Sequence, residues 1–152
     1  GFVKPFKIFK KYGIKIGVFG LGIELKGLVD KAMYKETVYH DPLETAQEMV
    51  RILKKENKCD LVICLSHLGY KYSKEDSGKI SDLKLAELTK DIDLIIGGHT
   101  HTFLDKPTIV KNLDGKEVLV NQVGCYGINL GRIDFYFDNT KTKTADGKSI
   151  VV

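Results

Sequence analysis

The sequence predicts an α/β fold with a mixed sheet whose C-terminal strands are antiparallel. Two short apolar-rich runs, residues 60–65 and 91–96, are typical of strands that are covered on both faces. A segment with apolar residues at helical spacing precedes each of these runs. After them come two further strand-like runs that are separated by a turn signal. At 152 residues the chain suits one domain that buries a sizeable core.

The N-terminal part of the chain is expected to form a hairpin. Residues 3–9 and 14–19 are apolar-rich, and Gly13 falls at the turn between them. Pro5 cannot donate a hydrogen bond to a neighbouring strand, which suits a strand at the edge of a sheet. Residues 21–39 have weak periodicity and charged interruptions, so they are interpreted as a long connecting segment.

Two helices are predicted from capping residues and apolar spacing. The first begins at Asp41, which is a suitable N-cap because Pro42 and Glu44 follow it in the pattern of a capping box. Its apolar residues continue at helical spacing as far as Asn57. The second, weaker pattern covers residues 81–90, with a serine as its N-cap.

The last third of the chain is predicted to be antiparallel. Residues 107–110 and 117–122 flank Leu113-Asp114-Gly115, which is a hairpin signal. Residues 133–137 and 149–152 follow as strands with a polar turn region between them. The expected layout is therefore α/β in the middle and antiparallel β at the end.

Composition excludes several classes of protein. The net charge of +4 is mild, and the basic residues form no run interleaved with aromatic residues, so no nucleic-acid polymer is expected as a partner. No stretch approaches the roughly 18 apolar residues of a membrane span. The three cysteines, Cys59, Cys64 and Cys125, are odd in number and form no CxxC pair, so buried thiols without a disulfide framework are expected. No signal peptide is visible, and the compartment stays open.

Three of the four histidines follow predicted strands. His67 comes directly after the run at 60–65, and His99 and His101 follow the run at 91–96. A strand–helix–strand crossover makes the two strands parallel, so their carboxyl ends lie side by side. His99 lies 32 positions after His67, which fits such a unit. Because imidazole is the commonest metal ligand in proteins, the three histidines predict a metal site at this edge of the sheet.

The residues around these histidines bear on the same prediction. Gly97 and Gly98 are expected to let the backbone turn sharply without a Cβ penalty, and the two rings of a His-x-His can face different metals. A single histidine after a strand is usually a hydrogen-bonded loop residue, so only the two motifs together predict a metal site. His40 is interpreted as a surface loop residue.

Carboxylates that could complete the site are scarce nearby. Asp60 and Asp93 fall at the opposite ends of their strands, about 20 Å from the histidines at about 3.3 Å per residue. Asp105 is close in sequence, and an exposed loop position is expected for it.

The two histidine motifs resemble those of a known family. Cys64-Leu65-Ser66-His67-Leu68-Gly69 and Ile95-Ile96-Gly97-Gly98-His99-Thr100-His101 are similar to the last two motifs of calcineurin-like metallophosphoesterases. The closer match is the branch of 5′-nucleotidases and 2′,3′-cyclic phosphodiesterases. Further similar strings span nearly the whole chain, at residues 4–6, 14–21, 122–127 and 130–132.

This resemblance implies half of a four-layer αββα sandwich and a site for two divalent transition metals, Zn or Mn. His67 and His99 would bind one metal and His101 the other. The remaining ligands and the catalytic histidine belong to motifs that precede the region matched by residue 1. Residues 1–152 are therefore expected to be a single partial metallophosphatase domain, its C-terminal half, with no catalytic residue and no activity alone. Family members are often exported.

The expected function is metal-dependent hydrolysis of a phosphoester, with a nucleotide or other small phosphoester as substrate. Two alternatives stay open: a non-catalytic metal-binding α/β module, and a structural domain whose histidines bind nothing. A half-domain would expose sheet edges and apolar faces, so self-association through an exposed sheet edge is also expected.

Overall fold

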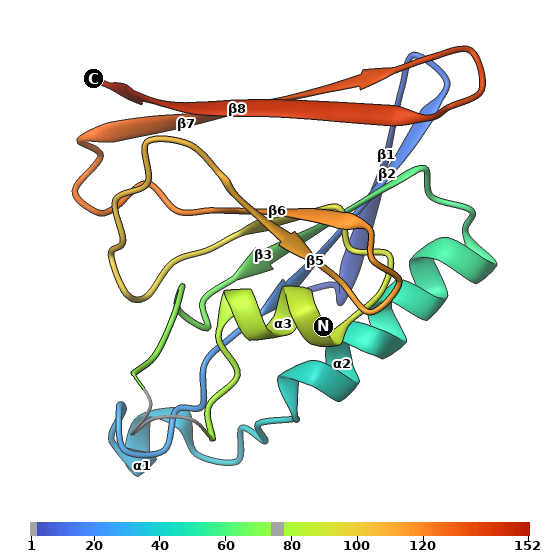
Figure 1. Ribbon diagram of the computed structural model, residues 1–152. Helices are drawn as coiled ribbons and strands as arrows, with labels where there is room; N and C mark the ends of the chain where they lie inside the picture. Colours follow the sequence, from blue (N-terminus) through green and yellow to red (C-terminus); the bar gives the residue numbers. More distant parts are fainter. Residues whose placement is uncertain (1–2, 74–77) are drawn as a thin grey trace.

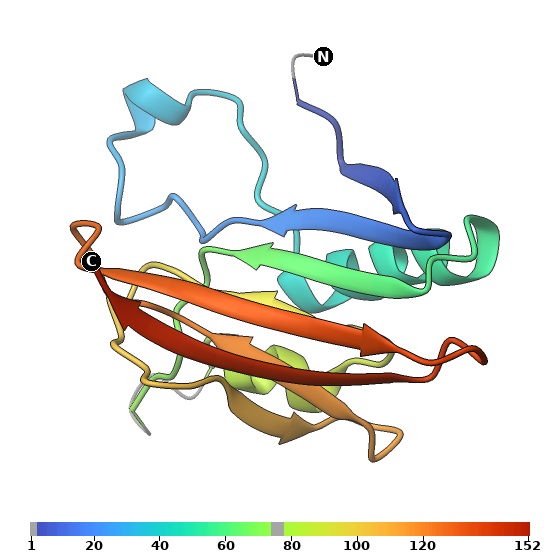
Figure 2. The same cartoon turned by 90° about the horizontal axis from the view of Figure 1, so that it is seen from above.

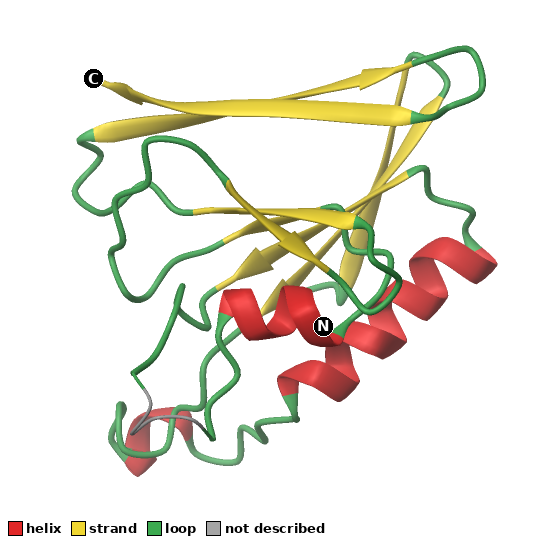
Figure 3. Ribbon diagram, viewed as in Figure 1, coloured by secondary structure: helices red, strands yellow, loops and turns green. Residues whose placement is uncertain are grey.

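The computed structural model describes residues 3–73 and 78–152 and confirms the α/β class. Three layers are visible in Figures 1 and 3: helices, a six-stranded sheet, and a two-stranded ribbon on the opposite side of that sheet. The elements in chain order are β1 (Phe6–Lys11), β2 (Ile14–Leu21), α1 (Lys31–Tyr34), α2 (Pro42–Val50), a π-helix (Arg51–Glu56), β3 (Leu61–Ser66), α3 (Asp82–Leu88), β4 (Leu94–Ile96), β5 (Thr108–Lys111), β6 (Glu117–Asn121), β7 (Asn129–Phe137) and β8 (Lys143–Val151).

The large sheet is mixed, with the strand order β1-β2-β3-β4-β6-β5. Strands β2, β3, β4 and β6 are parallel to one another, while the edge strands β1 and β5 are antiparallel to their neighbours. In the register of β3 and β4, Leu65 lies opposite Ile96. The segments that follow these two strands therefore leave the sheet side by side, as the histidine motifs require.

The predicted N-terminal hairpin is confirmed. Strands β1 and β2 are joined at Tyr12 and Gly13, and both residues adopt positive φ angles. Strand β1 is an edge strand, as Pro5 suggested, and its exposed lysines discourage pairing with another chain. Exposed apolar side chains include Phe9 of β1 and, near the carboxyl ends of β3 and β4, Leu65 and Ile96. Self-association stays a prediction.

The first predicted helix begins where the sequence placed it. The Asp41 carboxylate accepts hydrogen bonds from the backbone N–H groups of Leu43 and Glu44, both at 2.9 Å. The α-helical part ends at Val50, however, and a π-helix continues to Glu56. In this wider segment Leu53 is fully buried against Gly17, where an added Cβ would lie 2.8 Å from a Leu53 methyl carbon. The predicted helical extent to Asn57 is confirmed, because Asn57 caps the π-helix. The change from α to π geometry was not predicted, since apolar periodicity does not encode this packing.

The largest differences from the predicted strand lengths are in β4, β7 and β8. β4 covers only Leu94–Ile96, because Asp91 adopts a positive φ and breaks the extended run. β7 and β8 pair along their whole lengths and are longer than predicted. Charged residues, polar residues and glycines interrupt both strands, so only part of each was recognisable in the sequence. The connecting segment at 21–39 also contains the one-turn helix α1.

The core lies between the large sheet and the helices, where Phe19, Leu53, Val62, Leu85 and Ile95 are almost completely buried. All three cysteines are free thiols, as predicted; Cys59 and Cys64 are also buried as predicted, whereas Cys125 is only partly buried. None of the helices in the described ranges has the length and apolar character needed to cross a membrane.

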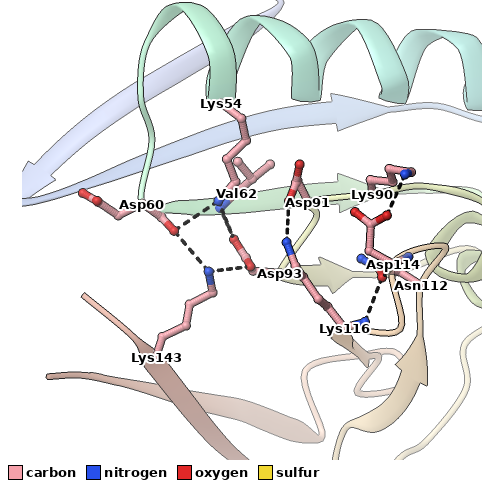
Figure 4. A network of polar contacts seen from close by, with 10 residues as sticks. All are labelled: Lys54, Asp60, Val62, Lys90, Asp91, Asp93, Asn112, Asp114, Lys116 and Lys143. Atoms are coloured by element: carbon pink, nitrogen blue, oxygen red, sulfur yellow. Dashed lines mark hydrogen bonds and ion pairs between the residues drawn. The ribbon is translucent and has the colours of Figure 1, made fainter. Parts of the chain in front are cut away.

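The ribbon is attached to the amino ends of the central strands (Figures 2 and 4). Lys143 forms an ion pair with Asp93 at 2.8 Å, and Lys141 forms one with Asp60 at 3.0 Å. Asp93 also accepts a hydrogen bond from the backbone N–H of Val62 at 2.7 Å. Asp60 and Asp93 thus lie at the end of the sheet opposite to the histidines, as expected, and hold the ribbon there.

Candidate metal centre

Two of the three predicted histidines lie together at the carboxyl ends of β3 and β4. The ring centroids of His67 and His99 are 5.3 Å apart, with the planes inclined at 63°. His101 is exposed beside them, and its ring centroid lies 6.5 Å from that of Tyr126. His40 is exposed, as predicted for a surface loop residue. The histidine motifs therefore lie at neighbouring strand ends, as the strand–helix–strand crossover predicts.

A short polar chain fixes the His67 segment. The backbone N–H of His67 donates to the carbonyl of Leu21 at 2.9 Å, which extends the pairing of β2 and β3. The Ser66 hydroxyl accepts from the Leu68 N–H at 3.1 Å and donates to the Asp82 carboxylate at 2.5 Å. The N–H of Asp82 in turn donates to a carbonyl of the same loop, that of Gly69, at 2.8 Å. Asp82, the first residue of α3, thus fixes this loop through the Ser66 hydroxyl and the Gly69 carbonyl.

A buried glutamine fixes the loop that carries His99. The Gln122 side chain is 2% exposed, and its amide nitrogen donates a hydrogen bond to the Gly98 carbonyl at 2.7 Å. Its amide oxygen accepts hydrogen bonds from the Thr102 backbone N–H and, at 3.1 Å, from the Thr100 hydroxyl. Thr100 therefore faces inward. Its neighbours His99 and His101 both adopt positive φ angles, of 71° and 51°. Such conformations persist in non-glycine residues only where the surroundings enforce them.

The expected role of Gly97 and Gly98 was wrong. Neither glycine has a positive φ, whereas His99 and His101 adopt the left-handed backbone conformation. Close approach explains both glycines instead. An added Cβ at Gly97 would lie 2.1 Å from Oδ2 of Asp82, and one at Gly98 would lie 3.0 Å from Nδ1 of His67. The two loops can approach each other because these positions have no side chain.

Replacing Gly97 with alanine should therefore destabilise the protein. We expect a loss of about 1–3 kcal/mol in the free energy of unfolding, because the new methyl group overlaps a buried carboxylate. Urea unfolding measures the effect. Gly22→Ala is the matched control, since nothing lies within 4 Å of its Cβ position. Equal stabilities of the two variants would contradict the close-approach explanation.

Burial dominates the electrostatics of the site. It lowers the pKa of His99, and the neighbouring His67, His101 and Lys79 lower this pKa further. Burial raises the pKa of Asp82 to about 6, against the opposing effect of the hydrogen bond from Ser66. Oδ2 of Asp82 has no hydrogen-bond partner within the described part of the chain.

The donor set fits part of a transition-metal shell. Imidazole nitrogens suit ions such as Zn²⁺, and His67 and His99 are close enough to share one. Within residues 3–73 and 78–152, however, no group of three or more His, Cys, Asp or Glu side chains could hold a metal ion. Further ligands from elsewhere would be needed for a complete site.

Sequence reasoning missed the supporting residues Gln122, Thr100 and Asp82. Asp82 looked like an ordinary first residue of a helix, although its burial is complete. The only signal for Gln122 was its place in the string at 122–127, which belongs to the family resemblance. The resemblance assigned no role to Gln122 itself.

Comparison with known proteins agrees with this arrangement, although no protein-family model matches the chain. The chain is 36% identical over 150 residues to the trifunctional nucleotide phosphoesterase protein YfkN of Bacillus subtilis, a match that covers 99% of this chain and 9% of that protein. It is 32% identical over 152 residues to the 5′-nucleotidase of Vibrio cholerae, covering 90% of this chain and 28% of that protein. The crystal structure of a 5′-nucleotidase precursor from Thermus thermophilus matches with a TM-score of 0.79 and 30% identity, over 97% of this chain and 29% of the other.

The strand order and the match to the Thermus thermophilus structure define a mixed α/β fold of the metallophosphatase type. The chain belongs to the calcineurin-like phosphoesterases, in the branch of the 5′-nucleotidases. It spans less than a third of the length of each of these three relatives.

Proposed function

We propose that this chain supplies the histidine ligands of a metal-dependent hydrolase that releases phosphate from nucleotides. The observation that carries the proposal is the 5.3 Å contact between His67 and His99, with His101 two residues further on. The names of the relatives, a nucleotide phosphoesterase and two 5′-nucleotidases, support a nucleotide as the substrate.

In this proposal His67 and His99 bind one divalent transition metal and His101 binds a second, with Zn or Mn as the ions. Bound metals would supply positive charge to the phosphoryl oxygens. The protein contributes the rigid presentation of the rings. Gln122 and the Ser66–Asp82 pair hold the two loops from the interior. The imidazoles of His67 and His101 are exposed, so a small phosphoester can reach them.

The remaining ligands and the catalytic histidine would come from outside residues 1–152. The chain alone is then a metal-binding module without hydrolytic activity. This second candidate function is favoured by one specific observation: in the described ranges, the ligand-type side chains form no group of three.

Phosphate release tests the proposal. We expect the protein encoded by the complete open reading frame to hydrolyse AMP and an aryl phosphate in the presence of Mn²⁺ or Zn²⁺, and a chelator to abolish the reaction. The isolated 152-residue chain should bind metal without hydrolysis. Hydrolysis that survives chelation, or that is unchanged in a His67→Ala variant, would contradict the assigned role of the histidines.

A further inference from the structure

Thr100 connects the two loops that carry the candidate metal ligands. The backbone N–H of Tyr70, in the loop that carries His67, donates a hydrogen bond to the Thr100 hydroxyl at 2.9 Å. Thr100 itself lies between His99 and His101 in the second loop, so a displacement of Thr100 displaces both of these rings. We propose that Thr100 is a positioning residue, which holds the rings of the two loops at the separation that a shared metal ion requires. This inference rests on the proposed function.

Protein groups use the whole hydrogen-bonding capacity of the Thr100 hydroxyl. A hydroxyl has one hydrogen to donate and two lone pairs that accept. The hydrogen of Thr100 is donated to the amide oxygen of Gln122 at 3.1 Å. One lone pair accepts from the Tyr70 N–H, and the other accepts from the Thr102 hydroxyl, whose oxygen lies 3.0 Å away. With three fixed partners the hydroxyl has a defined orientation and no lone pair left for a metal ion.

The Thr100 methyl group packs directly against the backbone of the His67 loop. An added Cβ at Gly69 would lie 2.8 Å from Cγ2 of Thr100, so a side chain at this position would separate the two loops. Gly69 is buried and has a φ of 97°, a conformation that glycine adopts without a Cβ penalty. The close approach of the loops thus depends on both faces of the Thr100 side chain, its methyl group and its hydroxyl.

Both partners of Thr100 are attached to neighbouring strands of the large sheet. The Tyr70 hydroxyl forms a hydrogen bond with the hydroxyl of Thr108 in β5 at 2.8 Å. Gln122 directly follows β6, which pairs with β5. Thr100 therefore lies between two groups that are themselves fixed to the sheet, and its hydroxyl transmits this fixed geometry to the histidine loops.

Thr100→Val tests the inference, because valine has nearly the shape of threonine without the hydroxyl. The first readout is the nuclear Overhauser effect between the ring protons of His67 and His99 in the metal-free 152-residue chain, since the ring centroids are 5.3 Å apart. We expect this signal to be weaker in Thr100→Val than in the wild type. Thr100→Ser keeps the hydroxyl, so the signal should be unchanged in that variant.

Metal binding is the second readout. Thr100→Val should weaken the affinity for Zn²⁺ by about tenfold or more, because groups that orient metal ligands typically contribute about 10–100-fold to metal affinity. The visible absorption bands of bound Co²⁺ should shift, because the arrangement of the ligands changes. A loss of stability alone would leave the Co²⁺ spectrum of the folded protein unchanged. Thr100→Ser should restore both the affinity and the spectrum of the wild type.

Thr89→Val is the matched control. Thr89 is 1% exposed and its hydroxyl donates to the Leu85 carbonyl at 2.6 Å, so this variant also loses an interior hydrogen bond. Thr89 precedes β4, whereas the histidines follow it. The ring contact, the Zn²⁺ affinity and the Co²⁺ spectrum of Thr89→Val should therefore equal those of the wild type. Equal behaviour of the two valine variants, or a Thr100→Ser variant that behaves like Thr100→Val, would overturn the inference.

Failure of this inference is distinguishable from failure of the proposed function. Zn²⁺ binding by the wild type that Thr100→Val retains in full would overturn the role of Thr100 and leave the metal ligands intact. A wild type that binds no Zn²⁺ would contradict the proposed metal ligands. In that case the ring contact in the metal-free variants still decides whether Thr100 positions the two loops.

Discussion

Replacing His99 with alanine is expected to lower the affinity of the chain for Zn²⁺ by at least about 100-fold. His99 is the histidine that faces His67 at 5.3 Å and also responds electrostatically to His101. Its removal leaves each of the other two imidazoles without an adjacent nitrogen ligand. Competition with a chromogenic chelator measures the affinity.

The matched control for this prediction is His40→Ala. His40 is exposed in the loop before α2 and contacts neither of the two histidine motifs in the described structure. Its replacement should leave the affinity for Zn²⁺ unchanged. If both variants bind Zn²⁺ as tightly as the wild type, the histidines at the strand ends are not ligands.

Replacing Asp82 with asparagine should remove a pH dependence of stability. Burial raises the pKa of this carboxyl to about 6 in the folded protein, above its ordinary value of about 4 in the unfolded chain. The folded state therefore binds more protons between these values. The stability that the protonated carboxyl contributes is complete below about pH 4 and is lost as the pH rises to about 6. Asparagine stays neutral throughout.

Relative to the wild type, Asp82→Asn should thus gain up to about 3 kcal/mol of stability between about pH 4 and about pH 7.5. Urea unfolding of both proteins at the two pH values measures this difference. Asp138→Asn is a control of opposite sign, because the Thr140 hydrogen bond lowers the pKa of the exposed Asp138 carboxyl. That variant should lose stability relative to the wild type only as the pH rises to about 4, so its difference from the wild type should stay nearly constant between about pH 4 and about pH 7.5. A difference between wild type and Asp82→Asn that does not change with pH would contradict the assigned burial.

The features that could be predicted from the sequence are those that local chemistry determines. Asp41 followed by proline specifies a helix start almost independently of the rest of the chain, and the structure confirms its capping bonds. The apolar runs before His67 and His99 require burial on both faces, which makes them parallel central strands. From that topology the meeting of the two histidines follows directly.

The features that could not be predicted depend on contacts between distant segments. Gly97 is a glycine because Asp82, fifteen positions earlier in the chain, packs against its backbone. Gln122 supports the His99 loop from a different strand. The π-helix is accompanied by the fit of Leu53 against Gly17. None of these pairs has a periodicity or spacing that a single sequence reveals.

The most direct test of the metal centre is the metal content of the tag-free chain, with X-ray absorption to identify the ligands. After incubation with Zn²⁺ and dialysis, we expect near-stoichiometric zinc with imidazole nitrogen ligands, and loss of that signal in His67→Ala. Protein that retains no zinc, or zinc bound without imidazole, would contradict the assignment of the histidines as metal ligands.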